Sequence, residues 1–163
     1  MARNKPPRCD VALLVDEETG EYGRGGHFIP EDDDVEEKVL RALRRIYRRV
    51  EVVPFSRKAD VTVQRLRRLK PRIVFNLTEW VDGDRRQDAA IAELLDALNL
   101  RYTGPGPEGL RLARDKELSK KIVAKQGVPV PRDGNGGHGY PLIVKPRYGD
   151  ASEGISNRSV VRS

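Results

Sequence analysis

The chain has 163 residues, which suits one domain, or one domain and part of a second. Charged residues make up 34% and hydrophobic residues 37%, and the apolar residues occur in clusters, which excludes a disordered chain. The sequence has one cysteine and no apolar run near the ~20 residues that a membrane helix requires, so a disulfide scaffold, a cysteine-rich zinc site and a membrane span are excluded and a cytoplasmic protein is expected.

The formal net charge of +6 raises the question of an anionic partner. The arginines recur along helical patterns, over 41–49 and 65–68, and they are interleaved with Leu, Ile and Val. This arrangement is typical of solvated helix faces. Nucleic-acid binding is the less favoured interpretation, because aromatic residues make up only 6% of the chain.

Short apolar runs alternate with amphipathic helical patterns from residue 10 to residue 126. The runs predict strands over Asp10–Val15, Val50–Phe55, Pro71–Asn76 and Leu100–Thr103. The amphipathic patterns predict helices over Asp34–Arg49, Asp60–Leu69, Asp88–Asn99, Pro107–Ala113 and Asp115–Gln126, and Asp16–Pro30 is interpreted as a loop. This βαβαβαβ order predicts a three-layer, Rossmann-like α/β domain with a parallel sheet and helices on both faces.

A change in composition marks the predicted domain boundary. Residues 128–140 are dense in Pro and Gly, which is typical of a linker. The prediction is therefore an α/β domain over 1–127, a linker over 128–140 and the start of a second domain over 141–163. The last segment has the pattern of a two-stranded hairpin, which cannot bury a core by itself.

Lys145 is the first candidate for phosphate binding. It ends an apolar run and precedes a loop whose small residues are Gly149, Ala151, Ser152 and Gly154. Small residues let backbone N–H groups approach phosphate oxygens, and the lysine supplies a point charge. A hairpin turn beside a surface lysine explains the same pattern, so both interpretations stay open.

Charges at two predicted helix starts are further candidates. Lys116 stands in the first turn of a helix, where the helix dipole disfavours a cation, so a bound anion is one explanation and a solvated lysine the other. Asp32–Asp34 precede the first helix; an acidic helix start is favoured there over a cation site.

The remaining candidates are single residues. Glu79 and Trp80 follow the third predicted strand, and ligands of open α/β sheets bind at the carboxyl ends of strands, so both are candidates for substrate contact. Cys9 is interpreted as an inert buried thiol. His27 and His138 lie in separate Gly-rich loops, and no metal site is expected from them.

Several short segments occur together in an order and spacing that is typical of one family. They are Val74–Leu77, Tyr102–Gly104, Asp115–Lys116, Gly127–Pro131, Val144–Pro146 and Ser152–Ser156. Together they resemble the ATP-grasp superfamily, and within it the D-alanine–D-alanine ligase and its close relatives. The resemblance runs from about Asp10 to Ser163.

The resemblance implies a pre-ATP-grasp domain followed by the start of an ATP-grasp lobe, with ATP between the two. Lys116 and Lys145 would reach the phosphates, and a lid would close over them, formed by Asp150, Ala151, Ser152, Glu153 and Gly154. A small amino-acid-like acid would become an acyl phosphate and then be attacked by an amine, with Mg²⁺ on the phosphates, as in peptidoglycan biosynthesis. A non-catalytic α/β module that binds a small ligand or a partner is the alternative, and a homodimer is left open.

Three departures from the family pattern limit what the resemblance implies. The ligases carry a Gly-Gly turn, a Ser and a Glu after the first strand, and Asp16–Asp34 has no clear counterpart; Glu79-Trp80 stands where they have His-Gly. The short 133–139 loop replaces a strand and a helix. After Lys145 the only carboxylates are Asp150 and Glu153. We therefore expect the metal ligands to lie outside this chain and the chain alone to be inactive; catalytic residues are not predicted.

Overall fold

The computed structural model describes residues 9–56, 58–79, 84, 87–132, 139–149 and 152–162. The chain forms two compact units, Met1–Gly106 and Pro107–Ser163. The first unit holds β1 (Val11–Asp16), η1 (Glu17–Thr19), β2 (Gly20–Tyr22), β3 (Phe28–Pro30), α1 (Val35–Ile46), β4 (Val50–Phe55), α2 (Ala59–Leu69), β5 (Ile73–Asn76) and α3 (Asp88–Ala97). The second holds α4 (Pro107–Arg114), α5 (Lys116–Lys125), β6 (Leu142–Ile143), η4 (Asn157–Ser159) and β7 (Val160–Val161).

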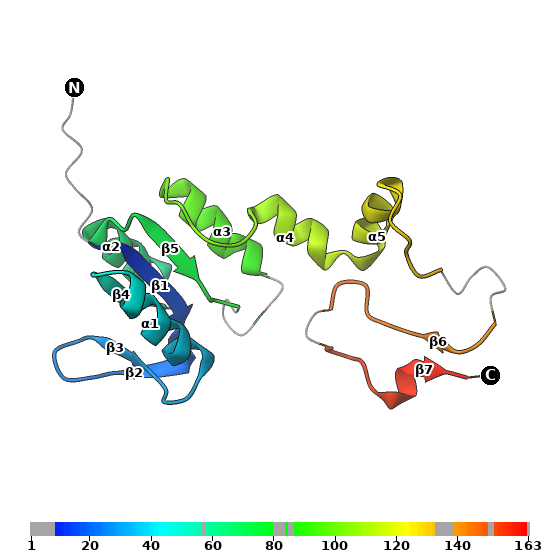
Figure 1. The fold of residues 1–163 in the computed structure, drawn as a ribbon, viewed down its shortest axis with the longest axis horizontal. Helices are drawn as coiled ribbons and strands as arrows, with labels where there is room; N and C mark the ends of the chain where they lie inside the picture. The colour runs from blue at the N-terminus through cyan, green and yellow to red at the C-terminus, as the bar shows by residue number, and fades with distance from the viewer. Residues whose placement is uncertain are drawn as a thin grey trace, which may run out of the picture. The chain divides into compact units, whose positions relative to one another are not determined.

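The centre of the first unit is a parallel sheet with the strand order β4-β1-β5 (Figure 1). Val11 of β1 pairs with Val50 of β4 and with Ile73 of β5. Every residue of β1 is buried, as expected for a strand that is covered on both faces and on both edges. The predicted α/β class and the parallel sheet are confirmed.

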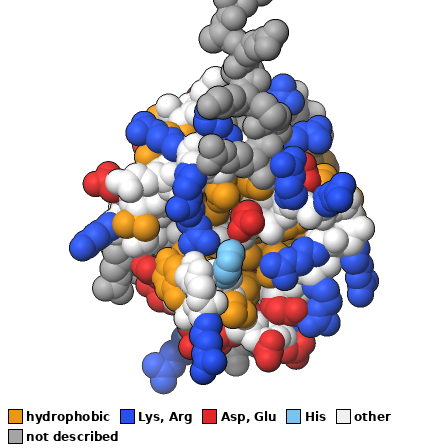
Figure 2. All heavy atoms as spheres, turned by 90° about the vertical axis from the view of Figure 1, so that its left-hand side faces the viewer, with side chains coloured by type: hydrophobic (Ala, Val, Ile, Leu, Met, Phe, Trp, Pro, Cys, Tyr) orange, Lys and Arg blue, Asp and Glu red, His pale blue; other side chains and the backbone are white. Residues whose placement is uncertain are grey.

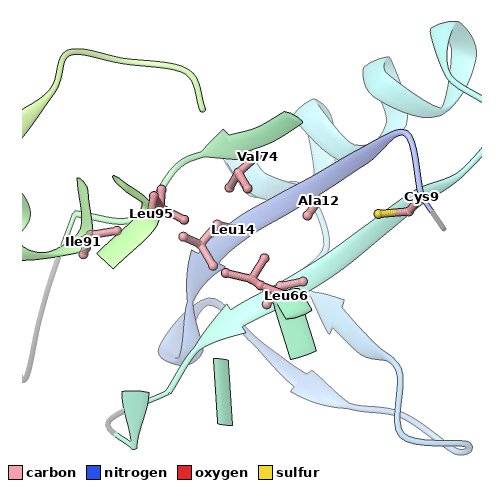
Figure 3. Close-up of a cluster of buried hydrophobic side chains, with 8 residues drawn as sticks. Cys9, Ala12, Leu14, Leu66, Val74, Ile91 and Leu95 are labelled. Carbon is pink, nitrogen blue, oxygen red and sulfur yellow. The ribbon is translucent and has the colours of Figure 1, made fainter. Parts of the chain in front are cut away.

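Successive side chains of β1 point to opposite faces of the sheet and build two core clusters. Ala12 and Leu14 join a cluster with α2 and α3, shown in Figure 3, whose members are Cys9, Ala12, Leu14, Val53, Leu66, Val74, Ile91 and Leu95. The other face meets α1 and β3 through Val11, Leu13, Val15, Phe28, Leu40, Leu43, Val50 and Val52. Helices therefore cover both faces of the sheet.

The prediction of a loop over Asp16–Pro30 is wrong, because this segment contains η1 and the antiparallel hairpin β2–β3. The Tyr22 and Phe28 rings meet edge to face, with centroids 5.4 Å apart. At Gly20 a Cβ atom would stand 2.2 Å from the carbonyl oxygen of Ile29, so only glycine permits this approach. Strands of three residues are too short to show an alternating pattern among acids and glycines.

Several elements are shorter than predicted, and two of them differ most from the prediction. The strand expected over Leu100–Thr103 is a single parallel bridge between Val74 and Tyr102. The helix expected over Asp34–Arg49 ends at Ile46, and the next residue is already extended, with φ −115° and ψ 141°. Residues 47–49 form the turn from α1 into β4, so the helix ends before them although the pattern of the arginines predicted that it would continue.

The second unit begins with two helices. Asp115 caps α5 as expected: its Oδ1 atom accepts hydrogen bonds from the backbone N–H groups of Glu117 (3.1 Å) and Leu118 (3.0 Å). Gly127 follows α5 with a φ of +77°, a conformation that favours glycine.

Farther along, β6 and β7 pair antiparallel over two residues each, which confirms the hairpin pattern of the tail. Ile143 and Val144 are 51% and 64% exposed, so this hairpin buries little apolar surface. The domain and linker boundaries at 127 and 140 remain predictions; α4 and α5 are grouped with the tail in the second unit.

Basic side chains are dispersed on the face shown in Figure 2, among hydrophobic and acidic ones, without forming one continuous patch. This distribution agrees with the interpretation of the arginines as solvated helix faces. Among the described residues, no helix is long and apolar enough to cross a bilayer.

Candidate functional site

A cavity of about 550 Å³ lies at the carboxyl ends of β1 and β5 in the first unit. It is lined by Asp16, Glu18, Thr19, Asp34, Val35, Glu36, Leu77 and Glu79. We call it the acidic pocket, because five of these residues carry carboxyl groups. Ligands of open α/β sheets bind at this edge of the sheet, so the acidic pocket is the main candidate for a ligand site.

Hydrogen bonds join residues that line the acidic pocket to their neighbours, and two of these bonds connect segments that are distant in sequence. Asp16 ends β1 and is buried, and its Oδ2 atom accepts the backbone N–H of Glu79 at 3.0 Å. The Leu77 backbone N–H donates to the carbonyl oxygen of Leu14 at 2.9 Å. The Thr19 hydroxyl donates to the carbonyl oxygen of Asp16 at 2.8 Å. The ends of β1 and β5 are therefore held side by side.

The turn after β5 fixes the direction in which the chain reaches Glu79. The Oδ1 atom of Asn76 accepts hydrogen bonds from the hydroxyl (2.6 Å) and the backbone N–H (3.2 Å) of Thr78, which is buried. The Asn76 backbone N–H donates to the hydroxyl oxygen of Thr103 at 3.0 Å. Glu79 thus follows a turn that is tied at three points.

The charge of the acidic pocket suits an ammonium group. The first turn of α1 also opens onto this pocket, and Asp34, the residue before α1, makes no side-chain cap there. A helix start without a side-chain cap offers backbone N–H groups to an anion. Carboxylates and N–H groups together fit a small zwitterion such as an amino acid.

Of the two residues predicted to contact substrate, Glu79 lines the acidic pocket. Trp80 lies outside the described residues. Asp16, Glu18 and Glu36 were missed, although acids directly after a buried strand and at a helix start are a usable signal when the strand order is known.

In the second unit, Lys116 lies against the loop that follows Lys145. Its backbone N–H donates to the carbonyl oxygen of Arg147 at 3.2 Å, and its Nζ atom donates to the carbonyl oxygen of Gly149. Lys145 itself is exposed. The structure therefore places Lys116 against the loop that begins after Lys145, the other lysine predicted to bind phosphate.

The described part of the predicted lid folds back on Pro146. Ile155 donates its N–H to the carbonyl oxygen of Ser152 at 3.0 Å, which closes a turn around Glu153. Gly154 has a φ of +68°, and a Cβ atom there would stand 2.9 Å from Cγ of Pro146. Glycine is therefore required at this position by both backbone conformation and space.

Asp150 and Ala151, the other two predicted lid residues, lie outside the described residues. Their assignment to the lid, with that of Ser152, Glu153 and Gly154, remains a prediction.

A cluster of charges that the sequence did not predict joins the start of α5 to the same loop. Arg147 binds Asp115 through two parallel hydrogen bonds, Nε–Oδ1 of 2.9 Å and Nη2–Oδ2 of 2.6 Å. Its Nη1 atom lies 2.9 Å from Oε2 of Glu117, and its guanidinium stacks 5.0 Å from the ring centroid of Tyr148. The Arg147 hydrogen bonds lower the pKa of Asp115 to about 2, with help from the N–H groups that it caps.

In the part of the chain that the structure describes, no three His, Cys, Asp or Glu side chains are grouped so as to hold a metal ion. Burial raises the pKa of the Cys9 thiol to about 11, which agrees with its interpretation as an inert thiol. His138 lies outside the described residues.

Comparison with known proteins shows partial similarity to D-alanine–D-alanine ligases. The chain is 35% identical to the enzyme of Zymomonas mobilis over 58% of its own length. It is 33% identical to that of Azorhizobium caulinodans and 36% identical to that of a Caulobacter species, each over 71% of its length. The matches span 27%, 39% and 37% of these relatives. No family model and no solved structure matches the chain.

These relatives support the resemblance seen in the sequence: the chain is similar to D-alanine–D-alanine ligases over part of its length. The chain spans less than two-fifths of the length of each of these relatives.

Proposed function

We propose that the chain is the substrate-side domain and the opening of the nucleotide-binding lobe of an ATP-dependent ligase that forms a C–N bond. The observation that carries this proposal is the acidic pocket at the carboxyl ends of β1 and β5, in a chain whose relatives are named D-alanine–D-alanine ligases. Such a pocket suits the ammonium group of an amino-acid-like substrate, which is the class of substrate that those names imply.

In this proposal the first unit binds the substrate. The acidic pocket receives the substrate ammonium, and the N–H groups of the first turn of α1 face its carboxylate. Glu36, in that first turn, adds a further negative charge. Binding both ends of the substrate fixes its orientation, which is the main contribution that a protein makes to acyl activation.

The second unit provides groups for the nucleotide. Lys116 and Lys145 would neutralise phosphate charge, and the lid over 150–154 would exclude water from the reactive phosphate. ATP supplies a phosphoryl group that converts the substrate carboxylate into an acyl phosphate, which an amine then attacks with loss of phosphate. Positioning and charge neutralisation dominate catalysis of this kind.

Among the described residues, no three His, Cys, Asp or Glu side chains are grouped so as to hold a metal ion. Glu153 belongs to the lid, where a carboxylate repels the phosphates. We therefore assign no step to a metal within this chain and expect its ligands elsewhere in the whole protein, so that the chain alone forms no dipeptide.

The substrate side is tested by titrating the chain with D-alanine and following backbone amide resonances by NMR. We expect shifts around the acidic pocket, and weaker or no shifts with propionate, which lacks the ammonium group. Glu79→Gln should weaken D-alanine binding by roughly 10- to 100-fold, the range of a charge-assisted hydrogen bond. The matched control is Glu21→Gln, at an exposed residue of β2. Equal binding of propionate, or no effect of Glu79→Gln, contradicts the proposal.

The nucleotide side is tested with ATP in the same assay. Lys145→Ala should weaken binding roughly 10- to 100-fold, whereas Lys125→Ala, which removes a lysine from the last turn of α5, should not. Because the acidic pocket lies wholly within the first unit, binding of D-alanine without any binding of ATP would instead favour the non-catalytic module.

A further inference from the structure

We propose that Arg147 is a positioning residue that joins the start of α5 to the loop after Lys145 and thereby fixes the Lys116 ammonium group for phosphate binding. This inference rests on the proposed function for the role of Lys116. The contacts by which Arg147 joins α5 to this loop lie within the second unit.

Arg147 holds the residue that begins the helix. Asp115 uses Oδ1 both to cap α5 and to accept the Nε–H of Arg147, while Oδ2 accepts a second N–H from the same guanidinium. Its carboxylate side chain is only 12% exposed. Paired hydrogen bonds of this kind fix orientation as well as distance. Lys116 is the next residue, so the ion pair between Asp115 and Arg147 also fixes the position of its backbone.

Two further contacts tie Lys116 to the loop. Its backbone N–H donates to the carbonyl oxygen of Arg147, so the arginine is engaged through its main chain as well as its side chain. The Lys116 ammonium donates to the carbonyl oxygen of Gly149. An ammonium group has three N–H donors, so Lys116 donates one to the Gly149 carbonyl, which orients it, and keeps others for a phosphate.

The carboxylates of Asp115 and Glu117, on either side of Lys116 in the sequence, are paired with Arg147 and Lys121. Asp115 and Glu117 both contact the guanidinium, and Glu117 also pairs with Lys121 at 2.5 Å. These ion pairs balance one another. A lysine in place of Arg147 lacks the planar fork that reaches both oxygens of Asp115 and contacts Glu117, so it is only a partial substitute.

The first experiment measures the reactivity of lysines in the whole chain, using acetic anhydride and mass spectrometry. With Arg147→Met we expect Lys116 to react at least about threefold faster, because its hydrogen bond to Gly149 is no longer held in place, while Lys125 keeps its rate. Arg158→Met, at an exposed arginine of η4, is the matched control and should change neither rate. An unchanged rate at Lys116 overturns the proposal.

A general loosening of the second unit would raise the rates of Lys116 and Lys125 together. Arg147→Lys then decides: it keeps the positive charge, and we expect an intermediate rate at Lys116 with Lys125 unchanged. If the acetylation rates of Lys116 and Lys125 rise together in both variants, the role of Arg147 is purely structural and the proposal is overturned.

The second experiment is a double-mutant cycle on ATP binding with Arg147→Met, Lys116→Met and both together. If Arg147 acts through Lys116, each single variant weakens binding about tenfold and the double variant is little weaker than either. Additive losses overturn the proposal. If the wild-type chain binds no ATP, the proposed function fails by itself, and the lysine reactivities still support or overturn the positioning of Lys116.

Discussion

Leu14→Ala tests the three-layer core on which the acidic pocket is built. Leu14 lies near the carboxyl end of the central strand, two residues before Asp16, and none of its surface is exposed. It packs in one cluster with Leu66 of α2 and Leu95 of α3 (Figure 3). Truncation of a fully buried leucine removes its transfer free energy and leaves a cavity, so we expect the free energy of unfolding to fall by about 2–5 kcal/mol.

That loss is a large part of the roughly 5–15 kcal/mol that stabilises a typical domain. The measurement is urea unfolding followed by far-UV circular dichroism, with the m-value compared between variants to confirm that the unfolded surface is unchanged. Ile46→Ala is the control, because Ile46 is 74% exposed at the end of α1 and its loss should cost within about 0.5 kcal/mol. A cost below about 1 kcal/mol for Leu14→Ala, or equal costs for both variants, would refute the assigned core.

Gly154→Ala should destabilise the second unit by about 1–2 kcal/mol in thermal unfolding, because a Cβ atom at a φ of +68° meets Pro146 at 2.9 Å; Gly139→Ala, with no atom within 4 Å, should be near neutral. Asp115 contributes stability that is complete above the ordinary pKa of 3.8 and is lost as the pH falls toward 2, since folding lowers its pKa. Hydrogen exchange of α5 should follow this course in wild type and less strongly in Arg147→Met, which keeps the capping N–H groups but loses the guanidinium. Cys9 should react slowly with a disulfide reagent at pH 8 in the folded chain and rapidly in urea, as its pKa of about 11 requires; rapid reaction in the folded chain would contradict its burial.

The parallel sheet was predictable because its central strand is buried on both faces. A strand in that environment is a continuous apolar run, as in β1, and the helices that cover it carry one apolar face each. Leu40 and Leu43 of α1 occupy that face, and the arginines between and after them stay exposed. The sequence predicts the structure here because burial determines both which residues are apolar and which faces of the strand and helices point into the core.

Contacts between distant residues were not predictable in the same way. Asp115 and Arg147 are 32 positions apart, and nothing in either local pattern indicates the other. The β2–β3 hairpin was missed because it depends on two short strands and on the space that Gly20 leaves. Glu79 was predicted as a site residue from the rule for strand ends, and it lines the acidic pocket, whereas Asp16 needed the strand order that places it beside Glu79.

The two candidate sites carry opposite charges on separate units, and this separation bears on the proposed reaction. The acidic pocket suits an ammonium group, but its carboxylates would repel the phosphates of ATP. The start of α5 offers the Lys116 charge, with its neighbouring carboxylates already paired to Arg147 and Lys121. A ligase that joins a zwitterion to an amine at the expense of ATP needs a negatively charged site for the ammonium group and a positively charged site for the phosphates. The charges of the two sites must not neutralise each other. A binding module needs only the first, so the ATP titration separates the two functions more sharply than the D-alanine titration does.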